Sequence, residues 1–406
     1  MTVEIVLVRH AQTEANAAGI WQGQADSDFS PVGADQVARL RKWLSGESFD
    51  RVIVSPLGRT RATARAIIGA AFEMDDRWRE PSVGEWEGMG YKEIAALEPQ
   101  KYFALMSGEN VLLDDEFLTD VAHRTKEAFD DIVDAASDGD RVLIVSHALA
   151  LLMFTSVVLG NPKQGSLGIQ ANTGVTRVFF DGGHTEISSY NDTGHLDPLV
   201  PSVRDGDSQI VLVRHGETES NLEGRWQGQS DGVLSREGHE QARRLGELGL
   251  RLDAVYSSPL GRARATALQL VTEADELRIV DDVQELDFGA WQNMRSVDIA
   301  AQFPDEWDLL RNQNRDIPRG GTGETFADVQ KRVAVAVDHI AHGHVGESVA
   351  VVSHGGASRA FALGVLGQGY AERRRLALLG NTAYARFIYT PRGPQLASWN
   401  SAPHLR

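Results

Sequence analysis

The sequence predicts an α/β protein of two tandem domains, each a three-layer α/β/α sandwich around a mostly parallel central sheet. The chain has 406 residues, which is more than one hydrophobic core usually serves. Its second half repeats the first, beginning with LVRHAQTEAN at Leu7–Asn16 and LVRHGETESN at Leu212–Asn221. Within each half, short apolar runs alternate with segments that carry apolar residues at helical spacing.

The short apolar runs predict strands that are buried on both faces of a sheet. The expected strands are Val3–Val8, Arg51–Val54 and Arg141–Val145 in the first half, and Gln209–Val213, Ala254–Ser257 and Ser348–Val352 in the second. The segments between the strands of the first half predict helices at Gly33–Leu44, Arg59–Ala71, Thr119–Ala135 and Leu149–Leu159. This alternation favours a parallel sheet that is covered by helices on both faces.

The repeat extends over almost the whole of each half, and its landmarks keep their order. They are Trp-Gln-Gly-Gln at 21–24 and 226–229, Ser-Pro-Leu-Gly-Arg at 55–59 and 258–262, Ser-His at 146–147 and 353–354, and Asn-Thr at 172–173 and 381–382. A polar stretch from Asn191 to Ser208, rich in Gly, Pro and Asp, separates the halves. We therefore expect domains at 1–195 and 209–406, joined by a linker at 196–208.

The composition excludes several functions. A formal charge of −17 would repel nucleic acids and anionic membrane surfaces. The chain has no cysteine, which removes disulfides, thiolate metal sites and thiol nucleophiles. It contains no apolar run of roughly 20 residues, as a membrane span requires, and begins with a strand rather than a secretory signal. We expect a cytoplasmic protein that binds neither nucleic acid nor a membrane.

Arginine and histidine side chains directly follow the predicted strands. Arg9-His10 and His147 each come after an apolar run, and Arg214-His215 and His354 do so in the second half. Because the carboxyl ends of parallel strands meet at one edge of a sheet, these side chains should converge. Phosphoryl transfer needs several fixed cationic donors, since its transition state spreads negative charge over the equatorial oxygens. The pattern therefore predicts a phosphoryl-transfer site at this edge of each sheet.

His10 is the expected nucleophile of the first site. A neutral imidazole can attack phosphorus in line and form a phosphohistidine that water later hydrolyses, and neighbouring cations keep it neutral by lowering its pKa. Arg9, Arg59 and His147 would hold the phosphate. Glu80 would protonate the leaving alkoxide and then accept a proton from the attacking water. In the second half these roles fall to His215, Arg214, Arg262, His354 and Glu285.

These motifs together resemble those of the histidine phosphatase superfamily, which includes cofactor-dependent phosphoglycerate mutases and many small-molecule phosphatases. The resemblance covers both halves almost end to end. It implies a phosphoglycerate mutase-like fold, a phosphorylated histidine at His10 and His215, and no metal or other cofactor. It also implies that Asn16 and Asn221 contact phosphate. We further expect the substrate pockets to be lined by Gln22, Gly23, Gln227 and Gly228.

The two halves differ at glycines that the resemblance places beside the phosphate. Ala11 and Ala148-Leu149 stand where the second half has Gly216 and Gly355-Gly356. Since glycine lets the backbone approach a phosphate closely, we expect the C-terminal site to be the stronger catalyst and the N-terminal site to differ in substrate or rate. A stretch resembling a family pocket loop, Pro318–Glu324, has an approximate counterpart from Gly108 to Glu116 that lacks its Gly-Gly pair.

The expected function is metal-independent hydrolysis of a small phosphorylated metabolite, at two sites. The segment between each glutamate and the second histidine is short, without the longer insertion that the resemblance attributes to phosphoglycerate mutases. Without such a lid, water reaches the phosphoenzyme more easily. Mutase-type phosphoryl transfer is the alternative among enzymes, and one catalytic domain beside a binding or regulatory domain is the alternative of another class. The chain would form a homodimer or an internal pseudo-dimer.

The remaining histidines and the tryptophans have simpler interpretations. His195 and the group His339, His342 and His344 lie on predicted helices or loops without matching acids in the first half, so they do not predict a metal site. The tryptophans are expected to pack against the rim of the sheet rather than to stack on a cofactor; they are Trp21, Trp86, Trp226 and Trp291.

Overall fold

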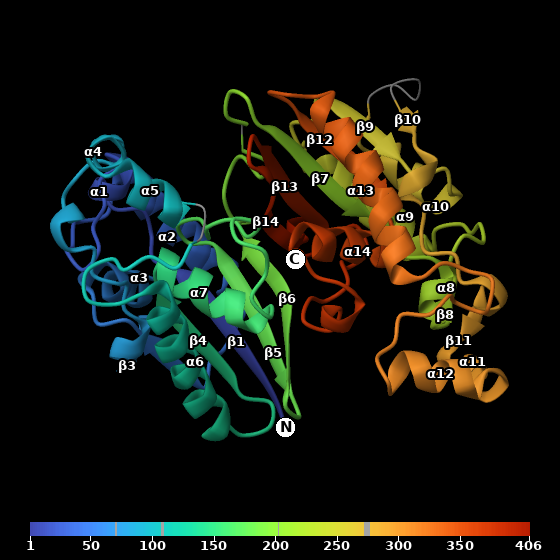
Figure 1. Cartoon of the computed structure of the whole chain (residues 1–406), viewed down its shortest axis with the longest axis horizontal. Coiled ribbons are helices and arrows are strands. Elements are labelled where there is room, and N and C mark those ends of the chain that lie inside the picture. Colours follow the sequence, from blue (N-terminus) through green and yellow to red (C-terminus); the bar gives the residue numbers. More distant parts are fainter. Residues whose placement is uncertain (70, 107–108, 202, 272–276) are drawn as a thin grey trace. The chain divides into compact units, whose positions relative to one another are not determined.

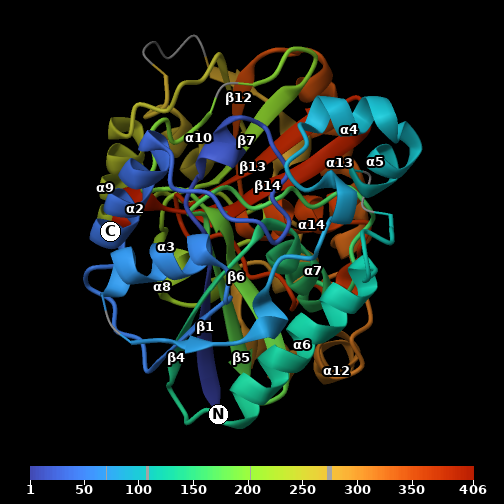
Figure 2. The same cartoon turned by 90° about the vertical axis from the view of Figure 1, so that its left-hand side faces the viewer.

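The computed structural model describes residues 1–69, 71–106, 109–201, 203–271 and 277–406. The described chain divides into two compact units, Met1–Leu196 and Asp197–Arg406. Each unit has a central sheet between layers of helices (Figures 1 and 2), so the predicted fold class is confirmed. Gly108, at the start of the expected counterpart of the pocket loop, lies outside the described residues.

The sheet of the first unit has the strand order β3-β2-β4-β1-β5-β6. Its strands are β1 (Thr2–Arg9), β2 (Arg51–Val54), β3 (Glu73–Met74), β4 (Arg141–Ser146), β5 (Val175–Asp181) and β6 (His184–Asp192). The pairs β3-β2, β2-β4 and β4-β1 are parallel. The pairs β1-β5 and β5-β6 are antiparallel. The hairpin β5-β6 is not among the strands that the sequence predicts. Its turn is Gly182-Gly183, with φ of 55° and 93°, as two-residue hairpin turns require.

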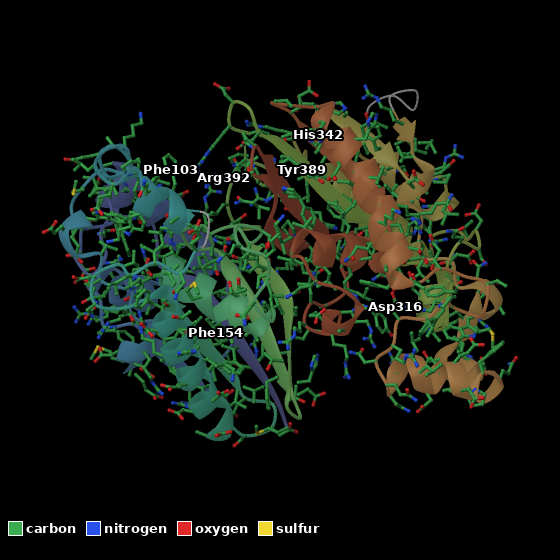
Figure 3. The ribbon with its side chains drawn as sticks, viewed as in Figure 1. Phe103, Phe154, Asp316, His342, Tyr389 and Arg392 are labelled. Atoms are coloured by element: carbon green, nitrogen blue, oxygen red, sulfur yellow. The ribbon has the colours of Figure 1, made fainter. Side chains whose placement is uncertain are left out.

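Helices cover both faces of this sheet. The helices are α1 (Glu14–Ala17), α2 (Pro31–Trp43), α3 (Gly58–Ile68), α4 (Tyr91–Leu97), α5 (Pro99–Met106), α6 (Leu118–Asp134) and α7 (Ala148–Val158), with 3-10 turns η1 (Asp76–Trp78) and η2 (Gly84–Trp86). Alternate residues of a strand point to opposite faces, and Val6 of β1 packs with Leu40 of α2 and Ala64 of α3. On the other face, α6 and α7 meet through Phe129 and Phe154, whose ring centroids lie 5.2 Å apart. Phe154 is labelled in Figure 3.

One predicted helix ends earlier than expected. The spacing predicts a helix to Ala71, but α3 ends at Ile68 because Gly69 adopts a left-handed conformation with φ of 61°. A glycine in this conformation is a common helix stop, because it has no Cβ to clash. Ala70, inside the expected range, lies outside the described residues.

The second unit repeats this topology with the strand order β10-β9-β12-β7-β13-β14. Its strands are β7 (Ser208–Arg214), β9 (Ala254–Ser257), β10 (Leu277–Ile279), β12 (Ser348–Ser353), β13 (Tyr384–Thr390) and β14 (Gly393–Ser401), and a separate pair is formed by β8 (Arg225–Trp226) and β11 (Met294–Arg295). Its helices are α8 (Glu219–Leu222), α9 (Arg236–Glu247), α10 (Gly261–Ala267), α11 (Ser296–Gln302), α12 (Pro304–Arg311), α13 (Phe326–His342) and α14 (Gly355–Val365), with 3-10 turns η4 (Asp281–Val283), η5 (Gly289–Trp291), η6 (Tyr370–Glu372) and η7 (Pro403–Leu405).

The core of the second unit forms where β7 and β12 pack on α9 and α10. Val211 of β7 lies with Leu245 of α9 in this cluster, and so does Val200, which is 3% exposed. On α13, Asp338 accepts a hydrogen bond at 2.7 Å from the hydroxyl of Tyr389, and this bond joins the helix to β13. Tyr389 is labelled in Figure 3. Within the described part of the chain, no helix is both long and apolar enough to cross a membrane.

Candidate active sites

His10 follows β1 at the carboxyl edge of the first sheet. Arg9 is paired with Ser146 in the parallel register of β1 and β4, so His10 and His147 emerge at the same edge. The Nδ1 atom of His10 lies 2.7 Å from the carbonyl oxygen of Ala11. A carbonyl can only accept a hydrogen bond, so Nδ1 carries the ring proton and Nε2 keeps its lone pair. His10 is only 3% exposed, and therefore presents a buried nitrogen whose lone pair can act as a nucleophile.

The charge state of His10 suits this role. Burial lowers the pKa of His10 well below its usual value, and the guanidinium groups of Arg59 and Arg9 lower it further. The ring is therefore neutral near pH 7, as nucleophilic attack through a ring nitrogen requires.

Arg59 is aimed at His10 by backbone carbonyls. Its Nε donates to His10 Nε2 at 3.3 Å, while its terminal nitrogens donate to the carbonyl oxygens of Gly23 and Ala25, each at 2.7 Å. Gly23 has φ of 52°, and a Cβ there would lie 2.5 Å from a carboxylate oxygen of Glu87. The predicted pocket residue Gly23 thus holds Arg59 through its backbone, in a conformation that favours glycine.

Glu80 lies at the N-terminus of α7. Its Oε2 accepts hydrogen bonds from the backbone N–H groups of Leu149 and Ala150 at 3.1 Å and 3.2 Å. Burial raises the pKa of Glu80, while the charge of Arg59 opposes the rise. A carboxyl group in this position can hold a proton at a higher pH than one in water, as a general acid must.

His147 lies beside His10, with ring centroids 5.3 Å apart. Its Nε2 contacts the hydroxyl of Ser55 at 2.7 Å, and its Nδ1 is buried without a partner among the described residues. The Nε of Arg9 is also buried without a partner there, although a terminal nitrogen of Arg9 donates to the carbonyl of Gln170 at 2.7 Å. Two buried nitrogens of this site, Arg9 Nε and His147 Nδ1, are therefore left for a ligand to contact.

Asn16 joins the site through a second asparagine. Asn172 donates to the backbone carbonyl of His10 at 3.0 Å and to the side-chain oxygen of Asn16 at 3.3 Å. Gln22 is buried, and its amide oxygen accepts from the hydroxyl of Thr13 at 2.6 Å and from the amide of Asn16 at 3.4 Å. Gln22 therefore fixes the short helix α1, which carries Asn16.

The second unit places the equivalent residues in the same geometry. The Nδ1 of His215 lies 2.6 Å from the carbonyl oxygen of Gly216, and Arg262 donates from Nε to His215 Nε2 at 3.2 Å. A terminal nitrogen of Arg262 donates to the carbonyl of Gly228 at 2.6 Å. Burial lowers the pKa of His215 well below its usual value. The guanidinium group of Arg262, and to a smaller extent that of Arg214, lowers the pKa further. Burial also lowers the pKa of Arg262 to about 10, which leaves it charged near neutral pH.

The other members of the second site match as well. His354 contacts the hydroxyl of Ser258 at 2.9 Å, and its ring centroid lies 5.0 Å from that of His215. Its Nδ1, like the Nε of Arg214, is buried without a partner among the described residues. The remaining contacts repeat those of the first unit: Gln227 accepts from Thr218 at 3.1 Å, Asn221 accepts from Asn381 at 3.3 Å, and Arg214 donates to the carbonyl of Leu379 at 2.7 Å.

The pocket loop Pro318–Glu324 lies against the segment that follows Glu285. Glu324 donates its backbone N–H to the carbonyl of Asp287 at 2.9 Å, and its carboxylate binds Arg332 at 2.6 Å. Arg332 also donates to the backbone carbonyl of Glu285 at 2.9 Å. The loop thus helps to place Glu285.

The two sites differ around their glutamates. Glu285 accepts from the N–H groups of Gly356 and Ala357 at 2.9 Å and 2.8 Å, closer than the equivalent contacts of Glu80 in the first unit. A Cβ on Gly356 would lie 2.6 Å from Oε1 of Glu285. Leu149 fills this position in the first unit, and its side chain packs in the buried cluster with Trp21, Val83 and Trp86.

The sites also differ in the charge beside the second arginine. Asp26 forms an ion pair with Arg59 at 3.0 Å. Its counterpart Asp231 accepts from the backbone N–H of Gly261 at 2.8 Å, as Asp26 does from that of Gly58 at 2.6 Å, but among the described residues it forms no ion pair with Arg262. Arg59 is therefore more completely neutralised by the protein than Arg262 is.

The structure places the predicted histidines and arginines of each site close together. The sequence did not predict the hydroxyls and amides that orient them. Ser55 and Ser258 contact the second histidines, and Asn172 and Asn381 hold the backbone of the first. The signal was present, because all of these residues belong to the repeated landmarks. No group of three or more acidic or histidine side chains that could hold a metal is found within the described residues.

The fold and the paired sites are those of an α/β enzyme that transfers phosphoryl groups through histidine. A family model described as the histidine phosphatase superfamily, branch 1, matches residues 5–193 and 210–402. The chain therefore belongs to the histidine phosphatase superfamily and carries its domain twice.

Three curated relatives are similar to one domain at a time. Phosphoserine phosphatase 1 of Hydrogenobacter thermophilus is 35% identical over 163 residues, which are 39% of this chain and 76% of the relative. A metal-independent phosphoserine phosphatase of Arabidopsis thaliana is 39% identical over 161 residues, covering 38% and 68%. A 2,3-bisphosphoglycerate-dependent phosphoglycerate mutase of Brucella anthropi is 32% identical over 168 residues, covering 39% and 81%.

Proposed function

We propose that both units hydrolyse phosphate monoesters of small metabolites without a metal, through phosphohistidines at His10 and His215. The observation that carries the proposal is a matched set of buried nitrogens without hydrogen-bond partners among the described residues. These nitrogens are Arg9 Nε and His147 Nδ1 in the first unit, and Arg214 Nε and His354 Nδ1 in the second. A buried donor left unpaired costs about 1–3 kcal/mol. The same atoms left unpaired twice indicate a ligand that supplies acceptors, and phosphate oxygens suit guanidinium and imidazole donors.

The geometry supports the following steps at the first site. His10 Nε2 attacks phosphorus while the bond from phosphorus to the ester oxygen breaks, and the proton of Glu80 goes to the leaving oxygen. Water then attacks the phosphohistidine and gives its proton to Glu80, and the bond between phosphorus and nitrogen breaks to release inorganic phosphate and neutral His10. Arg9 and Arg59 hold the equatorial oxygens and balance their charge. His215, Glu285, Arg214 and Arg262 act equivalently at the second site.

The names of the relatives suggest substrates to test, and the differences between the two sites suggest a difference in their rates. Phosphoserine and phosphoglycerates are the first substrates to test, because relatives carry these names. We propose that the second site is faster, since Glu285 is bound more closely than Glu80. We also propose a cytoplasmic location.

Two variants test the proposal. His10→Ala and His215→Ala should each remove one kinetic component of phosphoserine or p-nitrophenyl phosphate hydrolysis, measured with EDTA present, and the double variant should be inactive. The exposed His123 and His239 provide matched controls, since alanine there should leave both components unchanged. Substrate labelled with ³²P should leave acid-labile label on each single variant and none on the double variant. Turnover by the double variant would refute the proposal.

The same variants distinguish the alternatives. If His10→Ala leaves all turnover unchanged, the first unit is a binding or regulatory domain. Mutase-type transfer, favoured by the relative from Brucella anthropi, predicts interconversion of phosphoglycerates that depends on a bisphosphate primer. Phosphate release that does not depend on a primer would favour hydrolysis.

A further inference from the structure

A histidine near the end of each unit contacts the Asn-Thr turn, at 172–173 or 381–382, that binds the backbone of the nucleophilic histidine. In the second unit, His404 Nε2 lies 2.8 Å from the hydroxyl oxygen of Thr382, and this hydroxyl donates to the carbonyl of Asn381 at 2.6 Å. A hydroxyl has only one proton to donate. The contact with His404 must therefore run the other way, with the ring N–H donating to Thr382.

The first unit contains the same chain of contacts. His195 Nε2 lies 3.1 Å from the hydroxyl of Thr173, which donates to the carbonyl of Asn172 at 2.7 Å. We call Asn172, Thr173 and His195, and likewise Asn381, Thr382 and His404, the Asn-Thr-His chains. The mechanism proposed above uses none of their side chains.

Each Asn-Thr-His chain stabilises an unusual backbone conformation. Thr173 and Thr382 have φ of 57° and 58°, in the left-handed region that β-branched residues seldom adopt. The backbone N–H of Thr382 points at the carbonyls of Arg214 and His215, at 3.0 Å and 3.3 Å. The turn is thus held against the end of β7 by contacts on both its backbone and its side chain.

The turn places the side-chain amide of Asn381 against the backbone of the nucleophile His215. Asn381 donates to the backbone carbonyl of His215 at 3.0 Å and to the side-chain oxygen of Asn221 at 3.3 Å. A second asparagine supports the turn from the other side, since Asn400 accepts from the N–H of Gly380 at 2.7 Å. Asn191 binds Ala171 in the same way at 2.8 Å in the first unit.

We propose that His195 and His404 are positioning residues, each of which fixes its nucleophile and its phosphate-binding asparagine through the Asn-Thr-His chain. The inference rests on the proposed function for its catalytic consequence. The residues between each asparagine and histidine differ, being Asp-Thr-Gly at 192–194 and Ser-Ala-Pro at 401–403. The two segments nevertheless make the same contacts, so the contacts follow from the asparagine and histidine themselves.

The second site is tested in a chain whose first site is disabled by His10→Ala and Arg59→Ala. His404→Ala should lower kcat for p-nitrophenyl phosphate about tenfold, the effect of losing roughly one hydrogen bond, with a much smaller change in KM. Thr382→Val keeps the shape of the side chain and should cause the same loss. Both substitutions interrupt the same Asn-Thr-His chain of hydrogen bonds. The double variant should therefore be no slower than the worse single variant. His404→Gln, which can still donate, should recover most of the rate, and His239→Ala is the matched control.

A purely structural role would give a different result. His404→Ala would then lower the melting temperature and leave kcat and KM unchanged, and this outcome overturns the proposal. Losses of His404→Ala and Thr382→Val that add fully in the double variant also overturn it.

A readout that does not depend on turnover separates this proposal from the proposed function. Calorimetry with inorganic phosphate should show about tenfold weaker binding to His404→Ala and recovery in His404→Gln. If the parent chain hydrolyses no phosphomonoester, the proposed function fails, yet this pattern of phosphate affinity still supports the positioning role. Phosphate affinity and kcat that both stay within twofold of the parent would overturn it.

Discussion

Replacing Gly356 by leucine, the residue at the equivalent position 149 of the first unit, should slow the second site and leave the fold intact. A Cβ at position 356 would lie 2.6 Å from Oε1 of Glu285 and 3.2 Å from its Cδ. These atoms end a flexible side chain, so the carboxylate can move aside while the backbone stays in place. The effect therefore falls on the proposed general acid rather than on stability.

The size of the effect follows from the hydrogen bonds that hold Glu285. They measure 2.9 Å and 2.8 Å, whereas the bonds to Glu80, beside Leu149, measure 3.1 Å and 3.2 Å. A hydrogen bond contributes about 0.5–1.5 kcal/mol net. Losing both bonds as the carboxyl group moves aside costs about 1–3 kcal/mol, which is roughly five- to 150-fold in kcat.

The assay is steady-state hydrolysis of phosphoserine by the second site alone, in a chain that carries His10→Ala. Gly369→Leu is the matched control, because a Cβ at position 369 would have no neighbour within 4 Å among the described residues. It should change kcat far less than Gly356→Leu does. The reasoning is refuted if Gly356→Leu keeps kcat within twofold, or if the control loses as much.

Other predictions concern charge, pH and metal. Arg262→Lys should lower kcat/KM about 100- to 1000-fold, because it removes a donor aimed at the transferred phosphoryl group; Arg264→Lys, two positions away, should not. Because burial raises the pKa of Glu80, its proton is lost only at a higher pH, so the alkaline limb of phosphoserine hydrolysis by a His215→Ala chain should depend on Glu80 and vanish in Glu80→Gln. The lowered pKa of His354 means that the unfolded chain binds more protons below about pH 6.5, so stability falls with decreasing pH. His354→Gln should make that fall shallower by up to about 1.4 kcal/mol per pH unit in urea titrations. EDTA should leave turnover unchanged, and a loss that Mg²⁺ restores would contradict the mechanism.

The sequence predicted the parallel part of each sheet because buried parallel strands are apolar at nearly every position. The six expected strands lie within β1, β2, β4, β7, β9 and β12. The hairpin β5-β6 was missed because its strands mix apolar and polar residues, although the Gly182-Gly183 turn was a readable signal. Helix ends could not be fixed to the residue, as the left-handed Gly69 shows. The linker at 196–208 stays a prediction, and β7 begins at Ser208.

The sequence could predict that site residues lie close together only where those residues directly follow parallel strands. Register alone brings His10 and His147 together, because Arg9 pairs with Ser146. The orientation of Arg59 toward the carbonyls of Gly23 and Ala25 could not be predicted, since it depends on a loop conformation that local sequence does not determine. The sequence predicted no role for His195 beyond its exclusion from a metal site, because its contact with Thr173 depends on the folded hairpin between them.

The contacts that hold Arg262 also affect the choice of buffer for purifying and assaying the protein. The terminal nitrogens of Arg262 are held by the uncharged carbonyls of Gly228 and Ser230 rather than by an ion pair within the described residues, so the guanidinium can still attract tetrahedral oxyanions. Sulfate, arsenate and vanadate resemble the leaving phosphate in shape and charge, and should compete for the same place. Preparations salted out with ammonium sulfate, or screened in phosphate buffer, would therefore understate turnover, and dialysis into a zwitterionic buffer should restore it.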